Sequence, residues 1–124
     1  MIKVMIVDDE PGFATTLAER LELREISADT ANSGRAAMEL LPTVQPDVVL
    51  LDLSLPDMNG LKVLKLIKEF DETIEVVILT GKLACEVDGR QKEAFCCMSK
   101  PVELADLLVV IKDAHEARTM NTGG

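Results

Sequence analysis

Five polar side chains of this 124-residue chain stand at the ends of apolar segments. Asp8 and Asp9 follow "IKVMIV", Asp52 ends "VVLLD", Thr80 ends "VVILT" and Lys100 follows "AFCCMS". Clustered carboxylates repel one another and call for a hard divalent cation such as Mg²⁺. A carboxylate can also act as a nucleophile toward phosphorus, while a lysine and a hydroxyl bind phosphoryl oxygens. The five residues therefore indicate phosphoryl-transfer chemistry, provided that the fold brings them together.

Each of these residues also has an ordinary structural interpretation. An Asp after a strand usually caps a turn or helix, and Thr–Gly usually marks a turn. A single Lys usually lies on the surface. Asp52 is harder to explain in this way, because a carboxylate at the end of a buried strand is costly without partners. The joint arrangement of the five residues therefore carries the prediction.

The elements that must position these residues alternate along the chain. Short aliphatic runs predict buried strands, and apolar residues at helical spacing predict helices. The expected strands are 2–7, 26–31, 47–53, 74–80 and 94–99. Five helices are expected, at 9–24, 32–41, 61–70, 102–118 and within 81–93, where the pattern is poor and Gly89 interrupts any helix. Pro42 and Pro46 are expected to bracket a loop.

This alternation predicts an α/β fold, a doubly wound five-stranded parallel sheet with helices on both faces. Ligands of such sheets bind outside the carboxyl ends of the strands. All five polar residues belong on that edge. In the last strand, alternation predicts that Cys96 and Cys97 point to opposite faces, which argues against a shared metal. A disulfide between them is not expected, because adjacent Cα atoms lie about 3.8 Å apart and ordinary disulfides need roughly 4.4–6.8 Å.

Composition excludes several classes of function. A net charge of −9 argues against a nucleic-acid partner and against an anionic membrane surface. The hydrophobic fraction of 48% suffices for one core, which must be aliphatic because the chain has three Phe and neither Tyr nor Trp. The sequence shows no signal peptide and no apolar stretch near the length of a membrane helix. Three cysteines then favour a reducing cytoplasm with free thiols.

Four motifs, in this order, carry a family resemblance: "VDDE" (7–10), "PDVVLLDLSLPDMNG" (46–60), "ILTG" (78–81) and "SKP" (99–101). With them the chain resembles the receiver domain of bacterial two-component response regulators over about residues 2–117. The resemblance implies a flavodoxin-like sheet with strand order 2-1-3-4-5. It also implies a receiver domain at 1–118, with 119–124 as a disordered tail or the start of a linker.

The resemblance further implies a role for each site residue. Asp52 is the phosphoacceptor for the phosphohistidine of a sensor histidine kinase or phosphotransfer protein. Mg²⁺ is bound directly by Asp9, through water by Asp8, and by Asp52 and the backbone carbonyl of Ser54. The phosphoryl group is bound by Thr80 and Lys100, the Lys100–Pro101 peptide is cis, and Gly60 lets the loop beside the site turn.

Two departures from the family pattern concern the region that usually carries output. Receivers usually have Tyr or Phe three residues before the lysine as a rotamer switch, and here that position is Cys97. The interval from Thr80 to Lys100 is about two residues shorter than usual, so a short, displaced or partly disordered fourth helix is expected. These departures suggest an intact phosphorylation site without the aromatic coupling.

Other interpretations remain beside the phosphoacceptor. A degenerate receiver would act by protein contact with little or no phosphorylation-driven switching, and the altered output region keeps this alternative open. A dehalogenase-type phosphatase needs a second Asp two residues after the nucleophile, where this chain has Ser54. A flavin-binding flavodoxin needs a phosphate loop and aromatic residues that are absent or nearly so. The expected protein is a cytoplasmic signalling domain rather than an enzyme on a diffusible substrate. Its downstream effector is unspecified, and homodimerisation through the last helix is left open.

Overall fold

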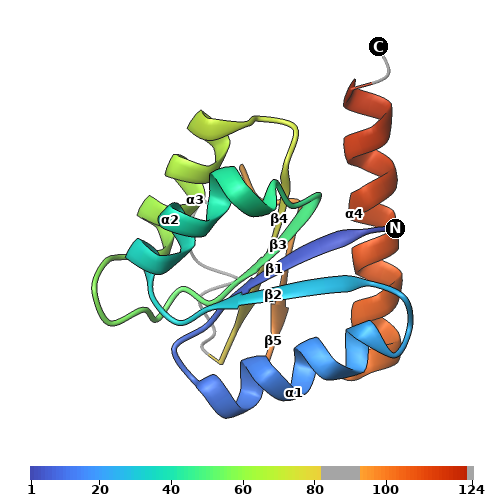
Figure 1. Cartoon of the computed structure of the whole chain (residues 1–124), viewed down its shortest axis with the longest axis horizontal. Helices are drawn as coiled ribbons and strands as arrows, with labels where there is room; N and C mark the ends of the chain where they lie inside the picture. Colours follow the sequence, from blue (N-terminus) through green and yellow to red (C-terminus); the bar gives the residue numbers. More distant parts are fainter. Residues whose placement is uncertain (82–92, 123–124) are drawn as a thin grey trace.

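A five-stranded parallel sheet forms the centre of the molecule. The computed structural model describes residues 1–81 and 93–122. The strands are β1 (Lys3–Val7), β2 (Ser27–Ala31), β3 (Val48–Leu51), β4 (Glu75–Thr80) and β5 (Cys96–Ser99). Their order in the sheet is β2-β1-β3-β4-β5, and all neighbouring pairs are parallel (Figure 1). The predicted fold class and strand order are therefore confirmed.

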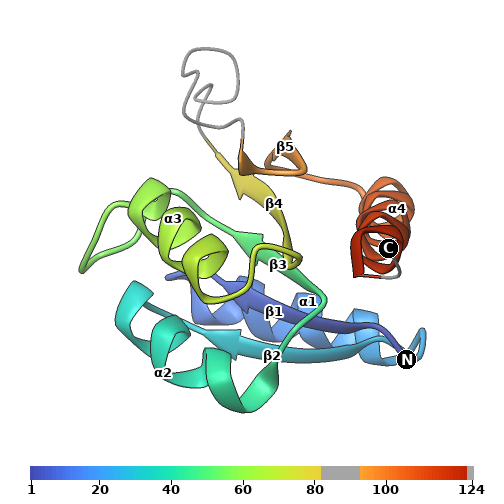
Figure 2. The same ribbon diagram turned by 90° about the horizontal axis from the view of Figure 1, so that it is seen from above.

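Four helices are described, and they cover both faces of the sheet. They are α1 (Pro11–Glu22), α2 (Gly34–Val44), α3 (Gly60–Phe70) and α4 (Leu104–Thr122). Helices α1 and α4 lie on one side of the sheet, and α2 and α3 lie on the other (Figures 1 and 2). The expectation of a short or displaced helix between β4 and β5 concerns residues 82–92, which lie outside the described residues.

Strand alternation divides the hydrophobic core in two. Val4 and Ile6 of β1 pack with α1 and α4, whereas Met5 and Val7 pack with α2 and α3. The same alternation holds in β3, whose four residues are all buried. Because both faces of the central strands are covered, these strands are almost purely aliphatic, and polar residues are confined to their ends.

Two helices end later in the chain than the sequence predicted. Helix α2 continues through Pro42 to Val44, so the expectation of a loop opening at Pro42 is wrong. Proline in the last turn removes only one backbone hydrogen bond, and the helix ends where Gln45 adopts a left-handed φ of 47°. Helix α4 continues to Thr122, so residues 119–122 are helical, whereas a disordered tail or the start of a linker was expected from residue 119.

At the edge opposite the strand carboxyl ends, an arginine anchors the last helix. The two Nη atoms of Arg118 on α4 lie 2.8 Å from Asp47 Oδ1 and 3.3 Å from Asp71 Oδ2. Asp47 precedes β3 and also accepts a hydrogen bond from the backbone amide of Lys3, at 2.9 Å. This ion-pair group, called here the Arg118 clamp, therefore joins α4 to the starts of β1 and β3 and to the end of α3.

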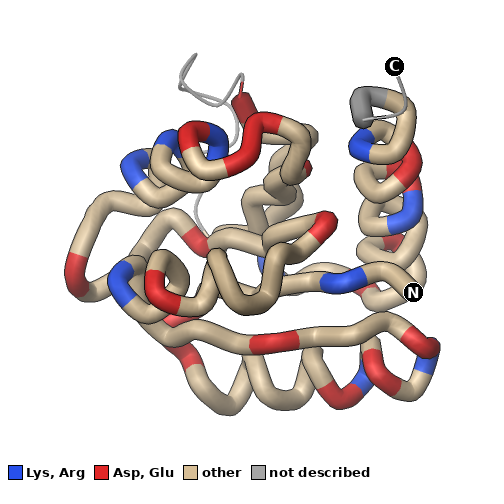
Figure 3. Tube along the Cα trace, turned by 45° about the horizontal axis from the view of Figure 1, so that its top comes forward, with Lys and Arg blue, Asp and Glu red and all other residues tan. Residues whose placement is uncertain are grey.

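Charged residues elsewhere are dispersed. Along the described chain, basic residues occur on all four helices and lie among acidic ones (Figure 3). None of the described helices combines the length and the apolar character needed to cross a membrane.

Candidate functional site

The carboxyl ends of four strands bring the predicted site residues together. Asp8, Asp52 and Lys100 come directly after β1, β3 and β5. Thr80 is the last residue of β4. The sheet hydrogen bonding continues into these residues. The backbone amide of Asp52 donates to the carbonyl of Val7 (2.9 Å), and that of Lys100 donates to the carbonyl of Thr80 (2.9 Å). Their positions are therefore set by the rigid sheet.

Lys100 links the two buried carboxylates of the site. Asp8 and Asp52 are only 2% and 5% exposed. The Lys100 ammonium donates to Asp8 Oδ2 at 2.6 Å and to Asp52 Oδ2 at 3.1 Å, and it lies 3.4 Å from Glu10 Oε1. These contacts supply the partners without which buried carboxylates would be costly.

The protonation of this group follows from burial and pairing. Burial raises the pKa of Asp8, and the hydrogen bond from Lys100 offsets only part of that effect. Burial by itself would lower the pKa of Lys100, but its hydrogen bonds to Asp8 and Asp52 outweigh burial and raise it. Lys100 therefore remains a charged ammonium at neutral pH.

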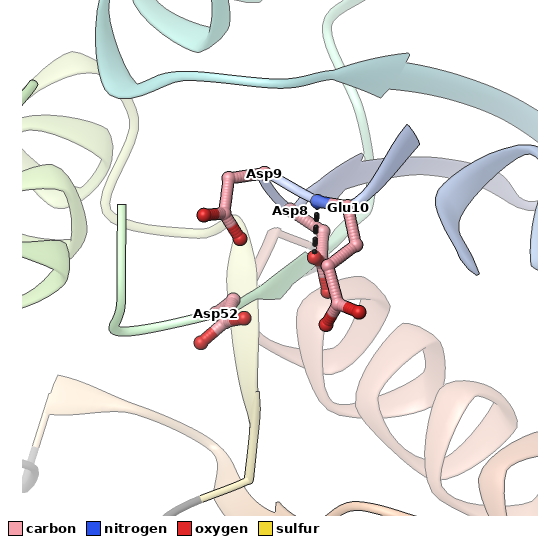
Figure 4. Close-up of side chains that lie close together, drawn as sticks. All are labelled: Asp8, Asp9, Glu10 and Asp52. Atoms are coloured by element: carbon pink, nitrogen blue, oxygen red, sulfur yellow. Dashed lines mark hydrogen bonds between the residues drawn. The ribbon is translucent and has the colours of Figure 1, made fainter. Parts of the chain in front are cut away.

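Four carboxylates form an acidic cluster at the ends of β1 and β3. Asp8, Asp9, Glu10 and Asp52 each offer an oxygen, and these oxygens all lie within 4.8 Å of one another (Figure 4). Four carboxylates exceed the charge of one Lys100 ammonium, and oxygen donors of this kind suit a hard divalent cation. The residues present therefore fit such an ion. Sequence reasoning did not assign a site role to Glu10, although the acidic run at 8–10 contains it.

Asp52 and Asp8 are also oriented by nearby backbone amides. The amide of Ser54 donates to Asp52 Oδ1, and the amide of Glu10 donates to Asp8 Oδ1, both at 3.0 Å. Ser54 also pairs with Asn59 in an isolated antiparallel bridge. Each carboxylate thus accepts a hydrogen bond at Oδ1 from the backbone amide two residues later, and its Oδ2 accepts one from Lys100.

The loop after Asp52 is held against two other elements. Asp57 accepts hydrogen bonds from the backbone amides of Gly34 and Arg35 at the start of α2, both at 2.9 Å. Those bonds lower the pKa of Asp57. At Gly60, a Cβ atom would lie 2.4 Å from Leu53 Cα. No described glycine has a positive φ, so the reason expected for Gly60, a special turn conformation, is replaced by close backbone packing.

Thr80 ends β4 with its side chain inside the protein. Thr80 is fully buried, and its hydroxyl has no hydrogen-bond partner among the described residues.

Cys96 packs on the α1–α4 side and Cys97 on the α2–α3 side, as strand alternation predicted. Cys96 is a free thiol, whereas Cys97 is disulfide-bonded. The expectation of free thiols is therefore confirmed at Cys96 and wrong at Cys97.

The predicted cis peptide is present between Lys100 and Pro101. Proline is the residue before which a cis bond is energetically accessible.

Known proteins resemble this chain over most of its length. The chain is 31% identical to sporulation initiation phosphotransferase F of Bacillus subtilis over 112 residues, covering 89% of this chain and 90% of that protein. It is also 31% identical to regulatory protein AtoC of Escherichia coli over 120 residues, but it spans only 26% of AtoC. The structure of the response regulator TrrA of Thermotoga maritima in complex with Mg²⁺–BeF superposes with a TM-score of 0.85 at 26% identity, covering 92% of this chain and 99% of that one.

The profile of one family, the response regulator receiver domain, matches residues 4–112. Such domains are parts of two-component signalling proteins and are not conventional enzymes. With its five-stranded sheet, its acidic cluster at Asp52 and this match, the chain belongs to the response regulator receiver domain family.

Proposed function

We propose that this receiver domain accepts a phosphoryl group on Asp52 from the phosphohistidine of a sensor histidine kinase or a phosphotransfer protein. The observation that supports this best is the placement of Asp52, buried at the sheet edge with Lys100 at 3.1 Å and three other carboxylates nearby. An Asp52 oxygen attacks phosphorus and forms the O–P bond. The P–N bond of phosphohistidine breaks, and its electron pair returns to the imidazole nitrogen.

Mg²⁺ is the cofactor that we propose for this transfer. Asp9, Asp52 and the backbone carbonyl of Ser54 would hold it directly, with Asp8 acting through water. The acidic cluster supports this assignment, as does the Mg²⁺–BeF complex of TrrA. The ion would neutralise the charge that develops on the transferred phosphoryl oxygens.

Two further residues donate hydrogen bonds to the phosphoryl group after it has been transferred. Lys100 exchanges its bond to Asp52 Oδ2 for a bond to a phosphoryl oxygen, since phosphorylation converts that carboxylate into an acyl phosphate. The Thr80 hydroxyl, which lacks a partner among the described residues, donates to a second phosphoryl oxygen. These new contacts favour one of two conformations of the domain, which is a shift in population.

Output goes to a downstream partner protein or effector domain in the cytoplasm. Cys97 occupies the position where receivers usually have an aromatic residue. We therefore propose that the usual coupling between the rotamer of that aromatic residue and Thr80 is absent. Beryllofluoride with Mg²⁺ should then change the amide NMR signals of the site and leave those of residues 82–93 nearly unchanged. Large shifts throughout 82–93 would contradict the absence of coupling.

The test of phosphoacceptor function is incubation with acetyl phosphate and Mg²⁺, followed by intact-mass measurement. We expect a gain of one phosphoryl group that is lost in Asp52→Asn. The matched control is Asp29→Asn, because Asp29 is an exposed carboxylate on the edge strand β2. A parent chain that binds Mg²⁺ and gains no mass would instead favour a degenerate receiver that acts by protein contact.

A further inference from the structure

We propose that Phe13 is a positioning residue that holds the Lys100 ammonium at the phosphorylation site through a cation–π contact. Phe13 lies in the first turn of α1, and Lys100 Nζ lies 4.4 Å from the centroid of its ring. This distance falls within the range in which the ring quadrupole attracts a cation. The inference rests on the proposed transfer of a phosphoryl group to Asp52.

The surroundings of Lys100 make this contact effective. Its side chain is 14% exposed, so water competes little for the ammonium. Cation–π attraction is stronger at desolvated sites than at exposed ones. The ammonium therefore has two kinds of partner, the carboxylates of Asp8 and Asp52 and the aromatic ring of Phe13.

These two kinds of partner behave differently during the proposed reaction. Asp52 becomes an acyl phosphate, so its Oδ2 is no longer a carboxylate partner of Lys100. The Phe13 ring takes no part in this change, and its attraction for the ammonium persists. Phe13 thus keeps Lys100 beside the site while the lysine exchanges a carboxylate for a phosphoryl oxygen.

The ring itself is held in place by packing. Phe13 is half-buried against the core cluster on the α1–α4 side, and it lines a groove there together with Leu17, Val102 and Leu107. A ring that is packed in this way loses little further freedom when it contacts the cation. The other two phenylalanines, Phe70 and Phe95, are exposed, which makes Phe70 a suitable control position.

The experiment compares three variants of the full chain. Phe13→Leu keeps an apolar side chain but removes the quadrupole, Phe13→Tyr restores an aromatic ring, and Phe70→Leu repeats the first change away from the site. The rate of phosphorylation by acetyl phosphate with Mg²⁺ is measured by intact mass. The ring-current shift of the Lys100 ε-methylene protons is measured by NMR, with thermal melting as a check of folding.

We expect Phe13→Leu to phosphorylate on the order of threefold to tenfold more slowly and to lose the upfield shift of the Lys100 protons. Phe13→Tyr should recover both, and Phe70→Leu should change neither. A folded Phe13→Leu with the parent rate would overturn the positioning role. So would Phe13→Tyr that restores the shift but not the rate. A parent chain that gains no phosphoryl group would overturn the proposed function, and the positioning role with it. That result differs from a parent chain that is phosphorylated at the same rate as Phe13→Leu, which overturns the positioning role alone.

Discussion

Replacement of Gly60 by alanine tests how tightly the loop beside Asp52 is packed. The new Cβ would lie 2.4 Å from Leu53 Cα, 2.9 Å from the Leu53 carbonyl oxygen and 3.0 Å from that of Asp52. All three atoms belong to the backbone, so no side-chain rotation relieves the contact. Ordinary van der Waals separation requires a displacement of about 1 Å, either of this loop or of the start of α3.

Two effects of this displacement can be estimated. Overpacking of this kind costs about 1–3 kcal/mol, and in a domain of this size the melting temperature should fall by about 4 °C for each kcal/mol. Moving Asp52 by about 1 Å should also slow its phosphorylation on the order of 100-fold. Thermal melting measures the first effect, and intact mass after acetyl phosphate treatment measures the second.

Two matched glycine-to-alanine variants serve as controls. At Gly12, which is exposed on α1, a Cβ meets nothing within 4 Å, so Gly12→Ala should leave phosphorylation unchanged and stabilise the protein by up to about 1 kcal/mol. At Gly34 the Cβ would meet only side-chain atoms, of Met58 and Val63, which shift more easily than backbone, so the loss should be smaller than at Gly60. Wild-type stability in Gly60→Ala would refute the packing argument. Lost stability with an unchanged rate would refute the link to Asp52.

Three further perturbations follow from the contacts described above. Arg118→Ala leaves Asp47 and Asp71 without their cation, and urea unfolding should show a loss of about 1–3 kcal/mol; a change below about 0.5 kcal/mol would mean that the clamp contributes little. The pKa of Asp57 is lowered by its bonds to backbone amides of α2, so the stability it contributes is complete above its ordinary pKa and is lost as the pH falls through the lowered value. The difference in urea midpoint between the parent and Asp57→Asn should therefore shrink below about pH 4, and a difference independent of pH would contradict this. Removal of Mg²⁺ by a chelator should abolish phosphorylation, and Asp9→Asn should raise the Mg²⁺ concentration for half-maximal rate at least about tenfold, whereas an unchanged requirement would exclude Asp9 as a ligand.

The arrangement of the sheet and of the site residues was predictable from the sequence for one physical reason. Parallel strands covered on both faces are aliphatic throughout, so the first polar residue after each run marks its carboxyl end. All such ends lie at one edge, and Asp8, Asp52, Thr80 and Lys100 therefore had to meet there. The strand order that makes these ends neighbours was implied by the family resemblance and not by this pattern.

The features that could not be predicted depend on contacts between distant segments. A run of three acidic residues does not say that Glu10 also turns toward the site. The need for glycine at position 60 arises from Leu53, because the backbone of Gly60 itself is ordinary. The Phe13–Lys100 contact joins the first helix to the residue after the last strand, and helical spacing alone marks Phe13 only as a core residue.

The division of the core into two clusters has a consequence for the divergence of such domains. Met5 and Ile6 share a peptide bond, yet they pack into cores on opposite faces of the sheet. A change of volume at Ile6 can be compensated only by residues under α1 and α4, and one at Met5 only by residues under α2 and α3. Substitutions should therefore accumulate as two separate sets of compensating changes. Neighbours in the sequence would then vary independently, whereas residues far apart on the same face would vary together.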